Sequence, residues 1–162
     1  MIKIESHDLK SVVSNCFIEN QKKLYLTALA ITKNHQHAED ALQETYIKTI
    51  KKYRQLRDTT VATTWITRIV INECKNILKR NKTISLDSLE FEIPYATDFD
   101  DEELHFYSII SNLTLQDKEI MTLKYFHGYT LDEISLILNM SISTVKSRVY
   151  RAIEKIKSEW RD

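Results

Sequence analysis

Hydrophobic positions along the chain recur at intervals of three and four residues, a period that predicts helices. The first predicted helix covers about residues 8–32, the second 36–53 and the third 64–80, with a polar break at 34–37 and a loop at 54–62. A short helix follows at 104–112, and three more begin near residues 114, 130 and 142. The stretch from 82 to 103 shows no such period, which indicates a connector between two helical groups.

Short polar residues mark the boundaries of the later helices. Thr114 with Asp117, and Thr130 with Glu133, have the three-residue spacing of a capping box. Gly128, the single glycine, directly follows one helix, where a left-handed residue is favoured. Asn139-Met140-Ser141 forms a tight turn, because Asn tolerates left-handed backbone and Ser can cap the next helix.

The segment from 130 to 156 is typical of a helix-turn-helix. In its second helix, an apolar stripe is formed by Val145, Val149, Ala152, Ile153 and Ile156. The opposite side carries Ser147, Tyr150, Arg151 and Glu154, flanked by Lys146 and Arg148. Hydroxyl groups and cations are donors that base edges and phosphates accept, so this face predicts DNA binding.

The third predicted helix has a polar stripe opposite its apolar face of Ile66, Ile69, Val70, Cys74, Ile77 and Leu78. The stripe consists of Arg68, Asn72, Lys75 and Lys79, with Trp65 at its start. Aromatic rings that stack bases, together with cations along the backbone, are typical of single-strand binding. The alternative is an amphipathic helix whose lysines face water.

The second predicted helix places Ile47 within a stripe that also contains Asp40, Gln43, Glu44 and Lys51. Its buried side is expected to be Ala38, Ala41, Leu42, Thr45, Thr49 and Tyr53. One exposed aliphatic residue is common and requires no function. Surrounded by these polar residues, however, Ile47 could be the dry centre of a protein contact.

Composition supports a helical chain with unevenly distributed charge. One Gly and one Pro among 162 residues leave little material for the turns of a sheet protein. Residues 1–82 carry a net charge of +7, residues 83–105 carry −8 and residues 106–162 carry +1. This partition suggests two modules with an acidic connector, although solvated charge runs alone would also produce it.

Candidate sites for metal or covalent chemistry are weak. Cys16 and Cys74 are isolated, and the five histidines show no ligand spacing with them, so we expect neither a metal nor a disulfide framework. His35 and His37 are expected at the surface near a helix start. No apolar run approaches the ~20 residues of a spanning helix, which predicts a cytoplasmic protein without membrane insertion.

Three segments of the chain resemble bacterial extracytoplasmic-function sigma factors. Residues 38–46 (AEDALQETY) resemble the family's AEDxxQExF segment, and residues 64–72 (TWITRIVIN) resemble its xWLxRIxxN segment. Residues 113–156 resemble the family's second domain, with its TVKSRxxRA signature at 144–152. The matches follow the family's order and spacing and cover nearly the whole chain apart from the connector.

The resemblance implies an all-α fold of two small helical domains. Residues 1–81 would be sigma region 2, residues 82–103 the acidic linker and residues 104–162 sigma region 4. The protein would bind core RNA polymerase and direct it to promoters, without a cofactor and without making or breaking a bond. An anti-sigma factor as an inhibitory partner follows from the resemblance alone.

The resemblance also implies roles for individual residues. Contact with the clamp helices of the polymerase would involve Asp40, Gln43, Glu44 and Ile47. Capture of the opened −10 strand would involve Trp65, Arg68, Asn72, Lys75 and Lys79, with the loop at 56–63. Contact with the −35 element would involve Thr144, Lys146, Ser147, Tyr150 and Arg151, with Arg148 and Lys155 near phosphates.

Two departures from the family pattern concern these roles. Family members often have Gly-Ile-Ser at the turn, where this chain has Asn139-Met140-Ser141. The loop before Trp65 often carries an aromatic residue, where this chain has Thr59-Thr60-Val61-Ala62. The second departure leaves the choice of −10 bases open.

Two other classes of protein would share parts of this pattern. A regulator that binds DNA without polymerase would have the same helix-turn-helix, but the first half shows neither a phosphoacceptor pattern nor a dimerisation seam. A helical scaffold would carry its polar stripes as solvated faces. An enzyme has little support, because there is no Gly-rich phosphate loop, metal-ligand spacing or nucleophile–base constellation.

Overall fold

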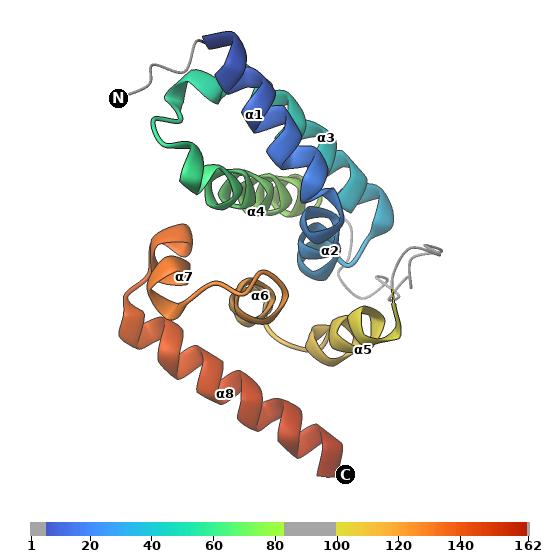
Figure 1. Ribbon diagram of the computed structural model, residues 1–162. Helices are drawn as coiled ribbons and strands as arrows, with labels where there is room; N and C mark the ends of the chain where they lie inside the picture. Colours follow the sequence, from blue (N-terminus) through green and yellow to red (C-terminus); the bar gives the residue numbers. More distant parts are fainter. Residues whose placement is uncertain (1–5, 83–99, 162) are drawn as a thin grey trace.

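The computed structural model describes residues 6–82 and 100–161, and within these ranges the chain is helical, with eight α-helices and no strand. Figure 1 shows helices α1–α4 gathered in one half of the molecule and α5–α8 in the other. The all-α fold expected from the sequence is therefore confirmed.

The first half consists of four helices around an apolar centre. They are α1 (Ser6–Glu19), α2 (Gln21–Thr32), α3 (His35–Lys52) and α4 (Ala62–Arg80), with short 3₁₀ turns η1 (Tyr53–Gln55) and η2 (Thr59–Val61) before α4. The buried side of α3 is the predicted one, since Ala38, Ala41, Leu42, Thr45 and Thr49 are all buried. Tyr53, expected on that side, is half-buried.

The single first helix predicted for residues 8–32 is wrong. The chain breaks at Asn20, whose side-chain amide donates to the carbonyl of Cys16 at 2.8 Å. An Asn side chain that bonds the backbone competes with the helical ladder. The break turns α2 so that nearly its whole length is enclosed, from Leu24 through Thr32 with Tyr25 half-buried. Val12 of α1, although apolar, is 37% exposed.

The start of α4 also differs from the prediction. Thr59, Thr60 or Thr63 could cap a helix by residue type, but the helix begins after Val61 without a side-chain cap. Asp58 instead accepts from the backbone and hydroxyl of Thr60, which stabilises the preceding 3₁₀ turn. Ile69 and Leu78, expected in the core, are half-buried, whereas Thr67, Ile71 and Glu73 are buried.

The second half consists of α5 (Asp101–Ile110), α6 (Leu115–Met121), a π-helical turn η4 (Thr122–Phe126), α7 (Leu131–Leu138) and α8 (Ile142–Arg161). Helices were expected to return at residue 104, but α5 begins at Asp101 with a capping box between Asp100 and Glu103. The last residues assigned to the acidic linker are thus the first turn of a helix, where carboxylates are favoured by the helix dipole. Most of that linker, residues 83–99, lies outside the described residues.

The other predicted caps and turns form, except that Thr114 and Asp117 lack the reciprocal backbone bond of a capping box. The hydroxyl of Thr114 accepts from the backbone of Asp117, and Thr130 and Glu133 bond each other in a capping box. Gly128 has φ of +71° and Asn139 has φ of +53°, the two left-handed positions expected from residue type. Lys33 at the end of α2 is also left-handed, with φ of +55°, which its residue type does not predict.

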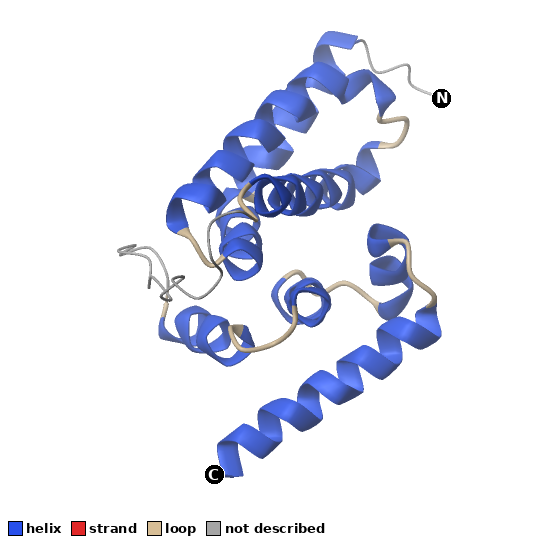
Figure 2. Ribbon diagram, turned by 180° about the vertical axis from the view of Figure 1, so that it is seen from behind, coloured by secondary structure: helices blue, strands red, loops and turns tan. Residues whose placement is uncertain are grey.

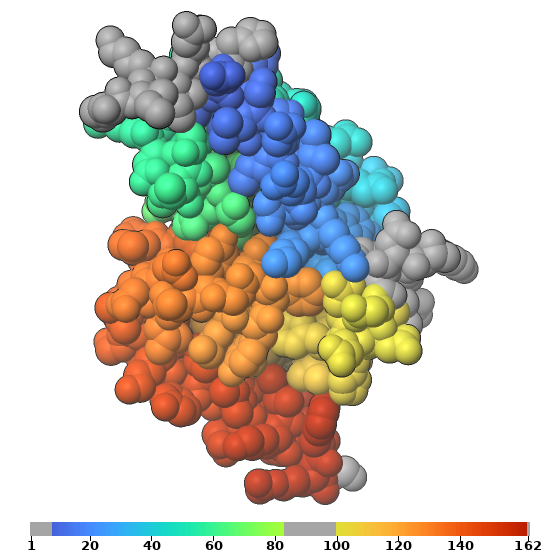
Figure 3. Space-filling model, viewed as in Figure 1, coloured from blue at the N-terminus to red at the C-terminus, as the bar shows by residue number. Residues whose placement is uncertain are grey.

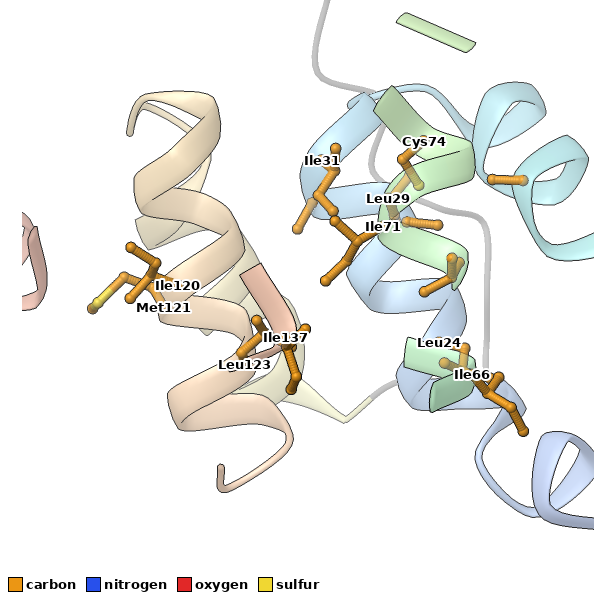
Figure 4. Packing of buried hydrophobic residues seen from close by; sticks show 14 of the residues in the cluster. Leu24, Leu29, Ile31, Ile66, Ile71, Cys74, Ile120, Met121, Leu123 and Ile137 are labelled. Atoms are coloured by element: carbon orange, nitrogen blue, oxygen red, sulfur yellow. The ribbon is translucent and has the colours of Figure 1, made fainter. Parts of the chain in front are cut away.

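The two halves pack against each other. One continuous apolar cluster contains residues of both, and Figure 4 shows Ile31 and Ile71 of the first half opposite Leu123 and Ile137 of the second. In the space-filling view the orange part of the second half lies directly against the green and blue parts of the first (Figure 3). This contact explains the buried Ile71, which the sequence could not assign to an amphipathic face.

Polar side chains fasten the same contact. Thr27 Oγ1 lies 2.6 Å from Nε2 of His127, and the Tyr107 hydroxyl donates to the carbonyl of Leu29 at 3.2 Å. Lys22 pairs with Glu103 at 2.9 Å. Each of these bonds joins α2 to a residue at least 78 positions later in the chain, so the halves meet along α2.

Candidate functional site

The helix-turn-helix is built by α7, a three-residue turn and α8. The capping box of Thr130 fixes the start of α7, and left-handed Asn139 ends it. The hydroxyl of Ser141 then accepts from the backbone of Thr144, which satisfies a donor at the start of α8. Val145, Val149 and Ala152 bury the inner side of α8. The predicted apolar stripe is therefore the one that holds the helix in place.

The outer side of α8 is exposed, as expected. Lys146, Ser147, Tyr150 and Arg151 are all accessible, and Tyr150 is 61% exposed. Figure 2 shows α8 running along the outside of the second half, away from the first. Two cations, a hydroxyl and a phenol on one helical face can donate to phosphates and to the acceptors of base edges in a major groove.

Three other residues assigned to this DNA contact have partners within the chain. Arg148 is half-buried, and its Nη1 donates to Asp117 at 2.9 Å. Lys155 Nζ donates to the carbonyl of Asn112 at 2.9 Å. The hydroxyl of Thr144 lies 2.7 Å from that of Ser141. These contacts tie α8 to α6 and to the turns around it, so they orient the recognition face.

Some side chains of the polar stripe on α4 are exposed, whereas others contact the rest of the protein. Arg68, Asn72 and Lys79 are exposed and Trp65 is half-buried against the core. Lys75, also half-buried, reaches Glu119 of α6 with 3.2 Å between Nζ and Oε2. The stripe therefore exists as predicted, but one of its cations forms an ion pair with the second half of the molecule.

The predicted protein-contact face on α3 is exposed and adjoins an apolar groove. Asp40, Gln43 and Glu44 are accessible, and Ile47 is 43% exposed. The groove lies between α1 and α3 and is lined by Phe17, Ile18, Gln21, Leu42, Gln43, Tyr46 and Ile47. Ile18 on α1, which the sequence did not single out, is 58% exposed and enlarges the apolar surface beside Ile47.

The contact between the halves contains ionisable groups that the sequence did not identify. Burial, together with the neighbouring Lys33 as the second cause, lowers the pKa of Lys118 to about 7. Burial lowers the pKa of His127 to about 4, with Lys23 as the second cause. Burial raises the pKa of Glu119, against the opposing effect of Lys75. The sequence could not identify these groups, because residues distant in the chain bury them and a single sequence does not show such contacts.

None of the described helices is both long and apolar enough to cross a membrane.

Two protein families match the chain in its two halves. Residues 16–84 match Sigma-70 region 2, and residues 104–156 match Sigma-70, region 4. The chain is similar to the RNA polymerase sigma factor SigV of Bacillus subtilis, with 26% identity over 152 residues that cover 91% of this chain and 90% of the relative. It is also similar to the ECF RNA polymerase sigma-E factor of Haemophilus influenzae, at 26% identity over 74% and 72% of the two chains.

Two solved structures share the fold. The sigma factor RpoE, in complex with the anti-sigma factor NepR from Bartonella quintana, superposes with a TM-score of 0.74 at 22% identity and covers 90% of this chain and 94% of its own. CnrH, in complex with the cytosolic domain of CnrY, superposes with a TM-score of 0.69 at 16% identity over 94% and 95% of the two chains.

Proposed function

The chain belongs to the extracytoplasmic-function sigma factors, which recognise promoters for RNA polymerase, and on that premise we propose how its surfaces divide the work. Residues 104–162 read the −35 element as duplex, and residues 1–81 bind the polymerase and hold the opened −10 strand. Residues 82–103 join them. The observation that carries this proposal is the exposed donor face of α8 on a capped helix-turn-helix.

In the −35 contact, α8 lies in the major groove with Lys146, Ser147, Tyr150 and Arg151 toward the DNA. Arg151 suits the O6 and N7 acceptors of a guanine, and each good bidentate contact discriminates by about 1–3 kcal/mol. Arg148 and Lys155 orient α8 without contacting the bases, because their head groups bond the Asp117 carboxylate and the Asn112 carbonyl.

In the −10 contact, Trp65, Arg68, Asn72 and Lys79 receive the unstacked strand. Stacking on an aromatic ring is worth roughly 1–3 kcal/mol per base, so capture of a few bases offsets the cost of opening them. Lys75 joins this set once its ion pair with Glu119 is broken.

The α3 face with Asp40, Gln43, Glu44 and Ile47 docks on the clamp helices of the polymerase. The apolar groove beside Ile47 gives this contact a dry centre with a polar rim, the usual anatomy of a protein interface. The protein acts as a binding factor in the cytoplasm and carries out no reaction of its own.

The same α3 face suits an anti-sigma factor that excludes the polymerase. One structural neighbour of the chain, RpoE, was solved in complex with an anti-sigma factor, and another, CnrH, in complex with the cytosolic domain of CnrY. Recovery of the protein from non-inducing cells with polymerase as its sole partner would contradict this part of the proposal.

The central test is transcription in vitro with core polymerase and genomic fragments. Replacement of both Lys146 and Arg151 by Ala removes two contacts, and we expect a loss of promoter-dependent transcripts on the order of 100-fold. Lys157→Ala, which removes an exposed cation farther along α8, is the matched control and should retain activity.

The alternative of a regulator that works without polymerase makes a different prediction. Such a protein would shift promoter DNA alone and would fail to retain core polymerase on a column. That pair of results would overturn the proposed function.

A further inference from the structure

The outer face of α8 carries a carboxylate among its cations and hydroxyl groups. Glu154 follows Ser147 by two helical turns, so both side chains project from the same line along the helix. That line lies opposite the buried Val145, Val149 and Ala152. The Glu154 side chain is 75% exposed. A strong hydrogen-bond acceptor therefore lies at the centre of a face whose other charged groups donate.

Glu154 contributes little to the stability of the fold. Within the described part of the chain its sole ion pair is with Lys157, at 3.7 Å between Nζ and Oε1, and both side chains are more than half exposed. Exposed pairs of this kind contribute little, and salt screens them. In contrast, Asp117 and Glu119 each bond a cation of another helix. The Glu154 carboxylate is therefore available to a partner outside the chain.

The position of Glu154 on α8 places it over the floor of the major groove. When a recognition helix lies in the groove, the centre of its outer face points to the base edges and its flanks point to the phosphates. Ser147 and Glu154 lie on the centre line, whereas Lys146 lies on a flank. Glu154 also follows Arg151 by three residues, which is about 4.5 Å along the axis and close to the rise of one base pair, about 3.4 Å. The base pair next to the one that Arg151 reads is therefore within reach of Glu154.

A carboxylate at this place distinguishes the four bases by the direction of its hydrogen bonds. It accepts hydrogen bonds and donates none. In the major groove guanine presents acceptors, thymine presents an acceptor and a methyl group, and adenine presents a donor beside the N7 acceptor. Cytosine presents the N4 amino donor and no acceptor. Glu154 is therefore attracted to cytosine, and each of the other three bases places an acceptor near its carboxylate.

We propose that Glu154 selects a cytosine in the −35 element, in the base pair next to the guanine that Arg151 reads. This inference rests on the proposed function and names a second base for the same recognition face. The two residues divide the readout, since Arg151 donates to a purine and Glu154 accepts from the amino group of a pyrimidine. Where cytosine is absent, the carboxylate remains unpaired beside the bases and weakens binding, so Glu154 adds specificity more than affinity.

Transcription in vitro with core polymerase tests the proposal on promoters that differ at single base pairs of the −35 element. The wild type should prefer cytosine over thymine at one position by about 5-fold to 100-fold, the discrimination of a good base contact. Glu154→Ala should lose this preference and keep the preference for guanine next to it. N4-methylcytosine at that position replaces the N–H that faces the groove by a methyl group and still pairs with guanine. It should reduce transcription by the wild type but not by Glu154→Ala.

Glu154→Gln separates base readout from a change of charge. The amide of Gln both donates and accepts, which matches the N6 and N7 groups of adenine, so the preferred base at the same position should change from cytosine to adenine. A structural role of Glu154 would not produce this change. Glu159→Ala removes another exposed carboxylate of α8, which lies off the recognition face, and this matched control should keep the wild-type preferences.

Identical base preferences of the wild type and Glu154→Ala at every position would overturn the proposal. An equal rise in transcription on all sequences would also overturn it, because the carboxylate would then act only by repelling phosphates. Circular dichroism verifies that the variants fold, as the exposure of Glu154 leads us to expect. Failure of the promoter function itself would be distinct, because the wild type would then give no polymerase-dependent transcripts from any promoter tested.

Discussion

At the scale of single residues, two arginines of α8, Arg148 and Arg151, differ in role although they lie only three positions apart. Arg148 is half-buried, its Nη1 bonds Asp117, and its Nε is enclosed without a hydrogen-bond partner. Arg151 is exposed on the outer face. Sequence spacing placed both near DNA, since a helical period alone cannot show that Asp117 of another helix reaches one of them.

This difference gives a prediction about stability and binding. Arg148→Ala leaves Asp117 without its cation and should lower the free energy of unfolding by about 1–3 kcal/mol. Arg151→Ala should leave the free energy of unfolding within about 0.5 kcal/mol of the wild type and should reduce affinity for promoter DNA in the holoenzyme. Urea denaturation and a DNA-binding titration separate the two effects. Equal stabilities of the two variants would contradict the structural role assigned to Arg148.

At the scale of elements, the short helix α7 depends strongly on its cap. It has eight residues, fewer than an isolated helix needs to be stable in water. The Thr130 hydroxyl accepts from the backbone of Glu133 at 3.2 Å, and the Glu133 carboxylate accepts from the backbone of Thr130 at 2.7 Å. The turn to α8 starts at the other end of this helix, so the cap also helps to place the recognition face.

We therefore expect Thr130→Ala to lower the free energy of unfolding by about 1 kcal/mol. Thr130→Ser retains a capping hydroxyl and should recover most of that loss, which makes it the matched control. Thermal unfolding followed by circular dichroism measures both. If Ser were no better than Ala, the hydroxyl would not be the stabilising group.

The elements also show which parts of the fold the sequence could predict. Caps and left-handed turns are local, so Thr114, Gly128, Thr130 and Asn139 were identified from residue type and spacing. The break at Asn20 was not, because Asn is compatible with a helix interior and its residue type does not show that its side chain bonds the carbonyl of Cys16. A continuous amphipathic pattern on either side of the break conceals it.

The α4 helix shows which part of the candidate site could be predicted from hydrophobic periodicity and which part could not. Its exposed stripe of Arg68, Asn72 and Lys79 could be predicted, because a helical period separates it from the core. The burial of Thr67 and the pairing of Lys75 could not, because their partners Tyr129 and Glu119 belong to the second half. Hydrophobic periodicity describes one element against its surroundings and contains no information on which distant element covers it.

At the scale of the whole molecule, the distribution of charge fits a factor that depends on the polymerase. A net charge of zero limits the counterion-driven affinity that would hold the chain on non-specific DNA. Two moderate contacts become strong together only when their spacing is fixed, since the second contact then forms at high effective concentration. The packed halves add a further condition. A compact chain of this length is roughly 40 Å across, whereas elements roughly 25 base pairs apart are separated by about 85 Å of duplex, so the halves must separate before both contacts can form.

A reversible covalent bridge across the two halves tests that condition directly. Lys22→Cys and Glu103→Cys replace two accessible side chains that form an ion pair across the contact, in a chain with Cys16→Ser, and a short bismaleimide with an internal disulfide joins them. We expect the bridged protein to support little promoter-dependent transcription with core polymerase, because its DNA-binding surfaces stay within roughly 40 Å of each other. Reduction of the internal disulfide should restore transcription to the level of the unbridged double variant.

The same reagent applied to a single-cysteine variant controls for modification alone. Full activity of the bridged protein would show that the packed halves can already engage a promoter, and the need for separation would be refuted.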